Sequence, residues 1–179
     1  MKKRLFIAFD LPDQVRSKLK LFPDPRLRIV SKDNLHITVL FLGYVDEDKI
    51  PEIKEAIKEI SQEFTPINFK FKDIIFAPPR KQFRMIWALF GKNRQFDNLV
   101  DKLARELKEF KPHVYKEKNI HITLARFNKP LTKKDLEEIK LPQDEVENFR
   151  ADKITLYESV LRSSGAVYKK LAEFQLNYL

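Results

Sequence analysis

The chain has 179 residues, of which 43% are hydrophobic and 34% charged, enough apolar side chain for the packed core of a globular protein. The absence of Cys excludes disulfides, thiolate nucleophiles and Cys-ligated zinc, and three scattered glycines exclude the Gly-rich loops that bind nucleotide phosphates. A net charge of +9 is typical of proteins with an anionic partner such as a nucleic acid, but also of a solvated Lys- and Glu-rich surface.

The apolar runs are too short for a membrane protein. None approaches the ~20 residues that span a bilayer. The basic N-terminal stretch carries only five apolar residues before Asp10, so it predicts a strand rather than a signal peptide. We therefore expect a cytoplasmic protein without a membrane partner.

Strand-like and helix-like segments alternate in the first half of the chain. Helices are predicted where apolar residues recur every three or four positions, and strands where they alternate or form short runs. The predicted order is a strand at Lys3–Phe9, a helix at Asp13–Phe22, a strand at Leu35–Leu42 closed by Gly43, a helix capped by Asp46 and running to Phe64, strands at Ile67–Lys72 and Ile74–Phe76, a basic turn at Pro78–Lys81 and a strand at Arg84–Phe90.

The second half repeats this alternation. The predicted elements are a helix at Phe96–Phe110, a strand at Asn119–Phe127, a short helix opened by Thr132, and strands at Phe149–Leu161 and Ala166–Asn177 around a hairpin turn at Ser163–Gly165. About four helices and seven or eight strands predict an α+β fold in which helices cover one face of the sheets. We expect one domain over residues 1–179, made of two lobes.

The two lobes are indicated by an internal repeat. Asn34–Val39 and Asn119–Leu124 match by residue class at every position and share Asn, His, Ile and Thr, 85 residues apart. Two copies at this distance do not make a solenoid. They favour a duplicated half-domain, with two pseudo-symmetric lobes facing each other across a central cleft.

The repeat places the same chemistry on both lobes. Residues i and i+2 of a strand project to one face, so His36 projects with Thr38, and His121 with Thr123. Cleavage of a phosphodiester without a metal needs a base for the nucleophile and an acid for the leaving oxygen, and imidazole can serve as either. Threonine hydroxyls can donate to the phosphate oxygens. The motif therefore predicts a phosphodiester site between the lobes.

Two other interpretations remain open. A lone His on an apolar strand often has only a structural role. Two matched copies of the motif make this structural interpretation weaker here. A zinc site is a rival, but Cys is absent and neither motif carries an adjacent carboxylate. We expect no metal and no cofactor, and we assign no role to His113, the third histidine.

The paired motifs resemble the His-x-Thr-x signatures of the 2H phosphoesterase superfamily, specifically the RNA 2′,3′-cyclic phosphodiesterases, also called 2′-5′ RNA ligases or LigT-like proteins. The resemblance covers nearly the whole chain. It includes Arg4–Ala8, Asn34–Gly43, Phe76–Arg80, His121–Arg126 and Leu156–Ser159 with Gly165–Tyr168. It implies a bilobed pseudo-twofold fold, with antiparallel sheets lining a basic central cleft and helices packed outside.

The resemblance also implies an activity and residue roles. The reaction would be metal-independent hydrolysis of an RNA terminal 2′,3′-cyclic phosphate to a 2′-phosphomonoester. His36 would be the proton donor to the leaving oxygen and His121 the proton acceptor that activates water, while Thr38, Thr123 and Arg126 would bind the phosphate. Plain alternation sends Arg126 to the face opposite His121, so a bulge, a strand end or its long reach must bring it back.

One part of the family pattern is missing. The family often has an aromatic residue before the first motif, where this chain has Ile29 and Val30. Phe41, Phe83 and Phe127 are candidates to stack on a base instead, although each also suits a place in the core.

Two alternative functions remain. The first is ATP-independent 2′-5′ ligation of tRNA half-molecules, which would use the same histidines with exchanged roles. The second is a non-catalytic module that binds RNA ends, with basic clusters at Arg26 and Arg28 and at Arg80, Lys81 and Arg84. The expected partner is an RNA or nucleotide with a 2′,3′-cyclic phosphate end, and the expected state is a monomer.

Overall fold

The computed structural model describes residues 1–78, 82–115, 117–142, 146–163 and 165–178. Within them it has three α-helices and ten strands, which confirms the α+β class. The helices are α1 (Asp13–Lys18), α2 (Ile50–Ser61) and α3 (Arg94–Glu106). The strands are β1 (Lys2–Asp10), β2 (Leu27–Ile29), β3 (His36–Asp46), β4 (Ile67–Phe69), β5 (Phe71–Ala77), β6 (Phe83–Phe90), β7 (His121–Leu131), β8 (Phe149–Ala151), β9 (Lys153–Arg162) and β10 (Gly165–Gln175).

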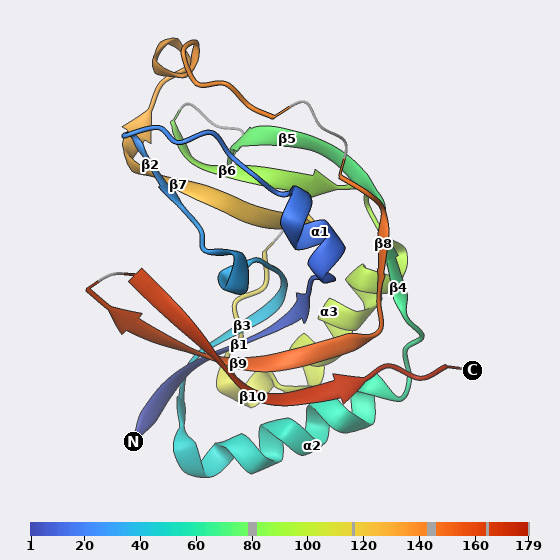
Figure 1. Cartoon of the computed structure of the whole chain (residues 1–179). Coiled ribbons are helices and arrows are strands. Elements are labelled where there is room, and N and C mark those ends of the chain that lie inside the picture. The colour runs from blue at the N-terminus through green and yellow to red at the C-terminus, as the bar shows by residue number, and fades with distance from the viewer. Residues whose placement is uncertain (79–81, 116, 143–145, 164, 179) are drawn as a thin grey trace.

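One large antiparallel sheet joins the two halves of the chain. Its strand order is β10-β9-β1-β3-β7-β6-β5, with β2 also paired to β7, while β4 and β8 form a separate two-stranded sheet. The halves meet where β3 and β7 pair at a single position, Ile37 opposite Ile122. On either side of this contact the strands diverge, and β5–β7 and β1–β9–β10 lie in different parts of the molecule (Figure 1).

The helices cover the outer face of this sheet. Isoleucines at helical spacing on α2 and apolar residues on α3 are buried, and α2 contacts β10 while α3 contacts β3. Ile53 and Ile57 are completely buried. Each such side chain stabilises the fold by about 1.5–3 kcal/mol relative to an exposed position. The two repeated strands are therefore anchored from behind by a continuous apolar core.

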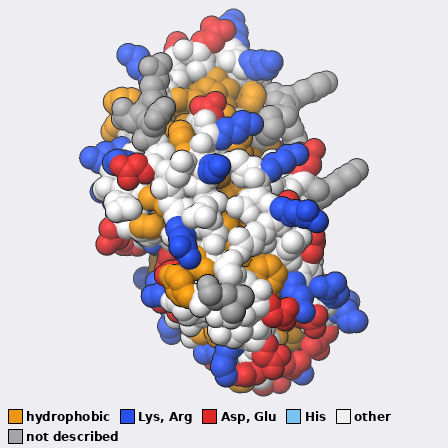
Figure 2. Space-filling model, turned by 90° about the vertical axis from the view of Figure 1, so that its right-hand side faces the viewer, with side chains coloured by type: hydrophobic (Ala, Val, Ile, Leu, Met, Phe, Trp, Pro, Cys, Tyr) orange, Lys and Arg blue, Asp and Glu red, His pale blue; other side chains and the backbone are white. Residues whose placement is uncertain are grey.

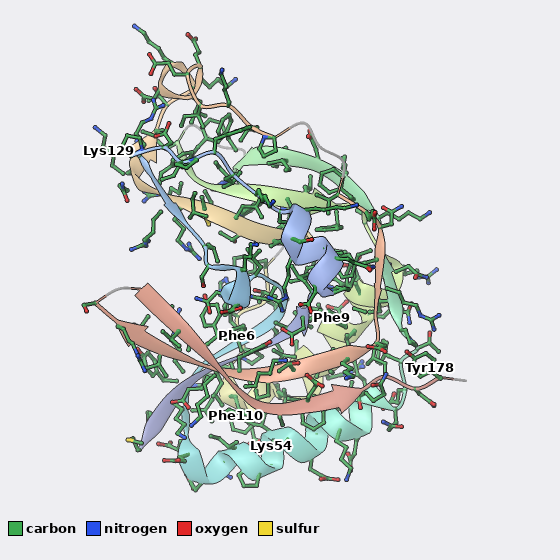
Figure 3. The ribbon with its side chains drawn as sticks, viewed as in Figure 1. Phe6, Phe9, Lys54, Phe110, Lys129 and Tyr178 are labelled. Carbon is green, nitrogen blue, oxygen red and sulfur yellow. The ribbon has the colours of Figure 1, made fainter. Side chains whose placement is uncertain are left out.

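A second, smaller cluster occupies the opposite face of β1 and β9. It contains Phe6, Ala8 and Tyr157, with Phe41 and Tyr168 packed against it. Phe6 lies near the middle of the molecule (Figure 3). The leucine and isoleucine neighbours of these residues belong to the main core, so β1 separates a helix-covered face from an open face.

The structure corrects several boundaries: the strand predicted at Phe149–Leu161 is two strands, β8 and β9, and the helix predicted after Thr132 is a 3₁₀ turn at Lys134–Leu136. Helix α1 ends at Lys18 rather than Phe22. Gly43 does not close its strand, because β3 continues to Asp46. Gly43 has a φ of 74° and lies next to a register shift within β3. A left-handed glycine serves a bulge here rather than a turn. Asp46 does not cap α2, because a 3₁₀ turn at Glu47–Lys49 intervenes and the Asp46 side chain makes no capping bond.

Two predicted turns include residues outside the described ranges. The basic turn Pro78–Lys81 includes residues 79–81, and the hairpin turn Ser163–Gly165 includes residue 164. The strands that flank each turn, β5 with β6 and β9 with β10, are paired antiparallel.

Charge is mixed on the face turned to the right in Figure 1. Figure 2 shows Lys and Arg side chains spread singly over this face, with Asp and Glu among them, most densely at its lower end. The positive net charge thus does not form one basic patch on this side. Among the described helices, none has the length and apolar character needed to cross a membrane.

Candidate active site

The two His-x-Thr motifs meet at the contact between β3 and β7. Because Ile37 pairs with Ile122 in antiparallel register, the two motifs are related by a local twofold axis. Both isoleucines are completely buried in the core. His36, Thr38, His121 and Thr123 are half-buried and project to the other side. The structure thus brings the four predicted side chains to one face at the centre of the sheet.

Equivalent hydrogen bonds orient the two imidazole rings. His36 Nδ1 lies 2.7 Å from the backbone oxygen of Asn34, and His121 Nδ1 lies 2.7 Å from that of Asn119. A carbonyl oxygen can only accept, so each Nδ1 carries a proton and each neutral ring has its lone pair on Nε2. In His36 this nitrogen accepts a hydrogen bond of 3.0 Å from Thr38 Oγ1.

A β-bulge brings Arg126 to the same face. Strand β6 pairs Ile86 with Ala125 but Trp87 with Thr123, so Leu124 is an extra residue in β7. Leu124 and Ala125 are both buried, and the exposed side chain that follows is Arg126. Its Nη1 lies 3.3 Å from Met85 Sδ. Of the three routes that sequence allowed for Arg126, the structure shows the bulge.

The matching strand has a matching bulge. Strand β1 pairs Ile7 with Leu40 but Ala8 with Thr38, which leaves Val39 as the extra residue in β3. The position equivalent to Arg126 is therefore Phe41. The twofold axis relates two histidines and two threonines, but at this third pair of positions the residue types differ. The site therefore has a cationic half with Arg126 and an aromatic half with Phe41.

Both histidines are poised to be neutral at pH 7. Burial lowers the pKa of His36 to about 4, and the charges of His121 and Arg126 add to this, while the Asn34 carbonyl and Asp10 oppose it. Burial also lowers the pKa of His121, again with a contribution from Arg126. The mutual effects of His36, His121 and Arg126 are those of groups that share one small region.

An ionic cluster beside His36 was missed by sequence reasoning. Asp10, the register partner of His36, accepts hydrogen bonds from Tyr157 and from Arg16, and pairs with Lys170. Burial acts to raise the pKa of Asp10, but Lys170, Tyr157 and Arg16 lower it, so its carboxylate is ionised. These residues come from four elements, and no periodic pattern in the sequence connects them.

Aromatic rings flank the two histidines differently. Trp87 stacks on His121, with ring centroids 3.8 Å apart and an interplanar angle of 20°. His36 has Phe6 at 5.0 Å and the edge of Tyr168 at 5.1 Å. The sequence showed Trp87 only as part of a strand.

The three residues predicted to stack on a base, Phe41, Phe83 and Phe127, lie in different surroundings. Phe83 and Phe127 are buried in the main core against Phe76, so they cannot meet a base. Phe41 lies on the open face beside Phe6.

Two basic clusters were predicted. In the cluster at residues 80, 81 and 84, residues 80 and 81 lie outside the described ranges. In the other, Arg26 is tied to Asp24 and Glu138, whereas Arg28 lies opposite Arg126 across β2 and β7.

The described part of the chain contains no cluster of three or more His, Asp or Glu side chains arranged to hold a metal ion. Among the described residues, the site gathers the two imidazoles, their hydroxyl, arginine and aromatic neighbours, and the Asp10 carboxylate beside His36. The arrangement can bind a small anion between two imidazoles that can accept or release protons.

Comparison with known proteins gives consistent matches over nearly the whole chain. The family model described as LigT like Phosphoesterase matches residues 12–87 and 91–168. The RNA 2′,3′-cyclic phosphodiesterase of Methanocaldococcus jannaschii is 30% identical over 177 residues, which cover 96% of this chain and 99% of that protein. The protein of the same name from Thermotoga maritima is 29% identical, over 96% of this chain and 95% of the relative.

Solved structures show the same fold. A protein of Thermus thermophilus superposes with a TM-score of 0.83 and 25% identity, covering 97% of each chain. Escherichia coli LigT in complex with 3′-AMP gives a TM-score of 0.79 and 25% identity, covering 99% of this chain and all of LigT.

Proposed function

Because the chain belongs to the LigT-like phosphoesterase family, we propose that it is an RNA 2′,3′-cyclic phosphodiesterase that opens a terminal 2′,3′-cyclic phosphate to a 2′-phosphomonoester. The observation that carries this proposal is the pair of His-x-Thr motifs related by the Ile37–Ile122 contact. Relatives named RNA 2′,3′-cyclic phosphodiesterase match nearly the whole chain, and the structure of LigT has been solved with the nucleotide 3′-AMP.

The reaction is an in-line displacement at phosphorus. Water attacks from one side while His121 Nε2 takes its proton, so a new P–O bond forms. The bond from phosphorus to O3′ breaks on the opposite side, and His36 donates its Nε2 proton to that oxygen. Two imidazoles across a local twofold axis suit these two roles, because attack and departure occur on opposite sides of the phosphate. Each proton transfer contributes about 10²–10⁴-fold in rate.

The remaining polar groups would hold the phosphate. Thr38 and Thr123 lie beside their histidines and can donate to the non-bridging oxygens, where charge builds up in the transition state. Arg126 adds a fixed positive charge on the His121 side. In the free protein Arg126 lowers the pKa of both histidines. A bound phosphate anion offsets that charge and raises both pKa values, so His36 gains its proton when substrate binds.

The two histidines are not equivalent in their surroundings. Only His36 has a carboxylate, Asp10, whose charge favours the protonated ring. Burial nevertheless leaves the pKa of His36 at about 4 in the free protein. The proton-donor role of His36 therefore depends on the bound anion, with Asp10 as support.

We extend the proposal to the partner and the state of the protein. In this proposal the substrate is an RNA with a 2′,3′-cyclic phosphate end, the protein acts in the cytoplasm, and the acting species is a monomer. One chain supplies every group of the site, which supports the monomer.

His36→Ala and His121→Ala should each lower kcat for a 2′,3′-cyclic nucleotide by at least about 100-fold, because each removes one proton transfer. Circular dichroism and thermal melting should match the unchanged protein. Thr38→Val should reduce the rate less strongly, and Thr65→Val, an exposed threonine elsewhere, should have no effect.

The same assay separates the alternatives. Full activity in both histidine variants would refute the two proton-transfer roles. EDTA should leave the rate unchanged; inhibition by EDTA that zinc reverses would instead favour a metal site. Binding of RNA ends without any turnover would favour a binding module, and a nuclease-resistant 2′-5′ joint between RNA halves would show ligation.

A further inference from the structure

The face that carries His36 extends well beyond the reacting groups. Strand alternation and register place Arg4 and Phe6 of β1 beside Tyr44 and Phe41 of β3 on this face. Their neighbours Leu5 and Val45 are buried in the core on the other side. Tyr44 is 66% exposed although it lies within a central strand pair. A tyrosine so exposed on an open sheet face offers an aromatic surface to a ligand.

A second segment adds rings along the free edge of β3. Phe41 forms an antiparallel bridge with His113, so these two side chains project to the same face. His113 packs against the edge of Tyr115 with centroids 4.4 Å apart, and Tyr115 is 58% exposed. We call Arg4, Phe41, Tyr44, His113 and Tyr115 the outer platform. It begins beside Thr38 and continues to Tyr44, about 20 Å at ~3.3 Å per residue.

The outer platform also carries an exposed cation, Arg4, opposite Tyr44. Lys3, on the helix-covered face of β1, is held in ion pairs with Glu47 and Glu158. Its neighbour Arg4 is exposed on the open face, and the Arg4 side chain forms no ion pair or hydrogen bond with any residue that the structure describes. Exposed rings beside an unpaired arginine are the combination that binds single-stranded nucleic acid, through base stacking and phosphate contact.

The in-line geometry decides which part of the substrate lies here. The leaving O3′, which His36 protonates, belongs to the terminal ribose, and that ribose stays bonded to phosphorus through O2′, whereas water enters on the His121 side. The terminal nucleoside and the strand on its 5′ side therefore lie over the half of the sheet that carries His36. This half is the aromatic one, with Phe41 at the position that Arg126 holds in the other half.

We propose, on the basis of the function proposed above, that the outer platform binds the nucleotides 5′ of the cyclic phosphate, with bases stacked on Tyr44 and Tyr115 and a backbone phosphate at Arg4. The preferred substrate is then a single-stranded RNA end of several nucleotides rather than a mononucleotide. Unpaired bases are required, because a base in a duplex cannot present its face to these rings.

The test compares kcat/KM for two substrates: a 2′,3′-cyclic mononucleotide and a single-stranded hexaribonucleotide that ends in a 2′,3′-cyclic phosphate. The hexamer should be preferred by about tenfold or more. Tyr44→Ala and Arg4→Ala should each lower this preference by about fivefold or more, as expected for the loss of one stacked base or one phosphate contact. Arg4→Ala should also reduce the salt dependence of KM for the hexamer.

Matched controls lie elsewhere on the surface. Tyr178→Ala removes an exposed tyrosine at the edge of the molecule that is far from Phe6 in Figure 3, and Arg105→Ala removes an exposed arginine of α3. Both should keep the preference of the unchanged protein. If Tyr44→Ala does not fold, Tyr44→Thr keeps a strand-forming residue and removes the ring.

The outcomes separate this proposal from the function beneath it. Equal kcat/KM for the mononucleotide and the hexamer, or an unchanged preference in the Tyr44 and Arg4 variants, would overturn the platform while leaving the phosphodiesterase intact. The platform would also be overturned if the hexamer reacted as fast when it is base-paired in a duplex as when it is single-stranded. If the unchanged protein hydrolyses neither substrate, the proposed function itself fails.

Discussion

At the scale of single residues, the site depends on how each imidazole is held. Both Nδ1 atoms donate to the carbonyl two residues earlier in the chain, so both rings present Nε2 to the substrate. The asymmetry comes from outside the motifs: Arg126 lies on one side, and Asp10 and a group of aromatic rings on the other. Identical motifs can thus take opposite roles in proton transfer.

The lowered pKa values determine the pH dependence. The proposed reaction requires His36 protonated and His121 neutral. The protonated fraction of His36 falls as pH rises above its pKa, and the neutral fraction of His121 falls as pH drops below its own. Since both pKa values lie below 6.5 in the free protein, kcat/KM should reach its maximum below pH 6.5.

Arg126→Ala should raise that optimum, because the arginine's charge lowers the pKa of both histidines. It should also raise KM by about tenfold through the loss of a charged phosphate contact. The measurement is kcat/KM for a 2′,3′-cyclic mononucleotide between pH 4 and 9, with Arg105→Ala as control. An optimum that does not move would show that Arg126 lies too far from the rings to influence them.

At the scale of elements, the bulges and the first helix set the geometry. The extra residue in β7 turns Arg126 to the site, and α1 places Arg16 where it contacts the turn before His36. Arg16 donates to the backbone oxygens of Lys32 at 2.6 Å and Leu35 at 3.3 Å, and to Asp10. This turn carries Asn34, whose carbonyl orients the ring of His36. Arg16 therefore acts as a positioning residue.

Arg16→Met should lower kcat by about tenfold with a smaller change in KM, because His36 loses its fixed orientation while the phosphate contacts remain. Arg16→Lys should recover part of the loss, since it keeps the charge beside Asp10. Lys18→Met serves as control, because Lys18 lies on the same helix in an exposed pair with Glu147. A change confined to KM would place Arg16 in substrate binding instead.

The sequence predicted these elements unevenly, for physical reasons. The repeated motif was visible because four residue identities recur at the same positions in both copies, and apolar periodicity located α2 and α3. Asp10, Tyr157 and Lys170 carry no such signal, since register alone brings β1, β9 and β10 together. Phe83 and Phe127 could not be told from Phe41 by residue type. The roles of the five predicted site residues stay predictions until they are tested.

At the scale of the whole molecule, the two halves share one sheet and one core. Strands of both halves meet at Ile37 and Ile122, and a single buried cluster contains residues from β1 to β9 and from α1 to α3. Separate unfolding of one half would expose the core of the other. This agrees with the proposal of one domain made of two pseudo-symmetric lobes.

Calorimetric unfolding should accordingly give one transition, with equal calorimetric and van't Hoff enthalpies. The expected enthalpy is on the order of 125 kcal/mol near 60 °C, from about 0.7 kcal/mol per residue. Truncation of Ile37 to Ala should lower the single melting temperature without splitting the transition. Two resolved transitions would show that the halves are independent domains.

The stacking of Trp87 on His121 has a practical consequence. This is the chain's single tryptophan, and its indole lies directly against one of the two proton-carrying rings. An imidazole that gains a proton becomes a cation over an aromatic face, and such contacts are favourable by about 2 kcal/mol or more when the ring is buried, as Trp87 is. We therefore expect the indole's emission to respond to the charge of His121, which would make Trp87 an intrinsic optical reporter of ligands that change this charge.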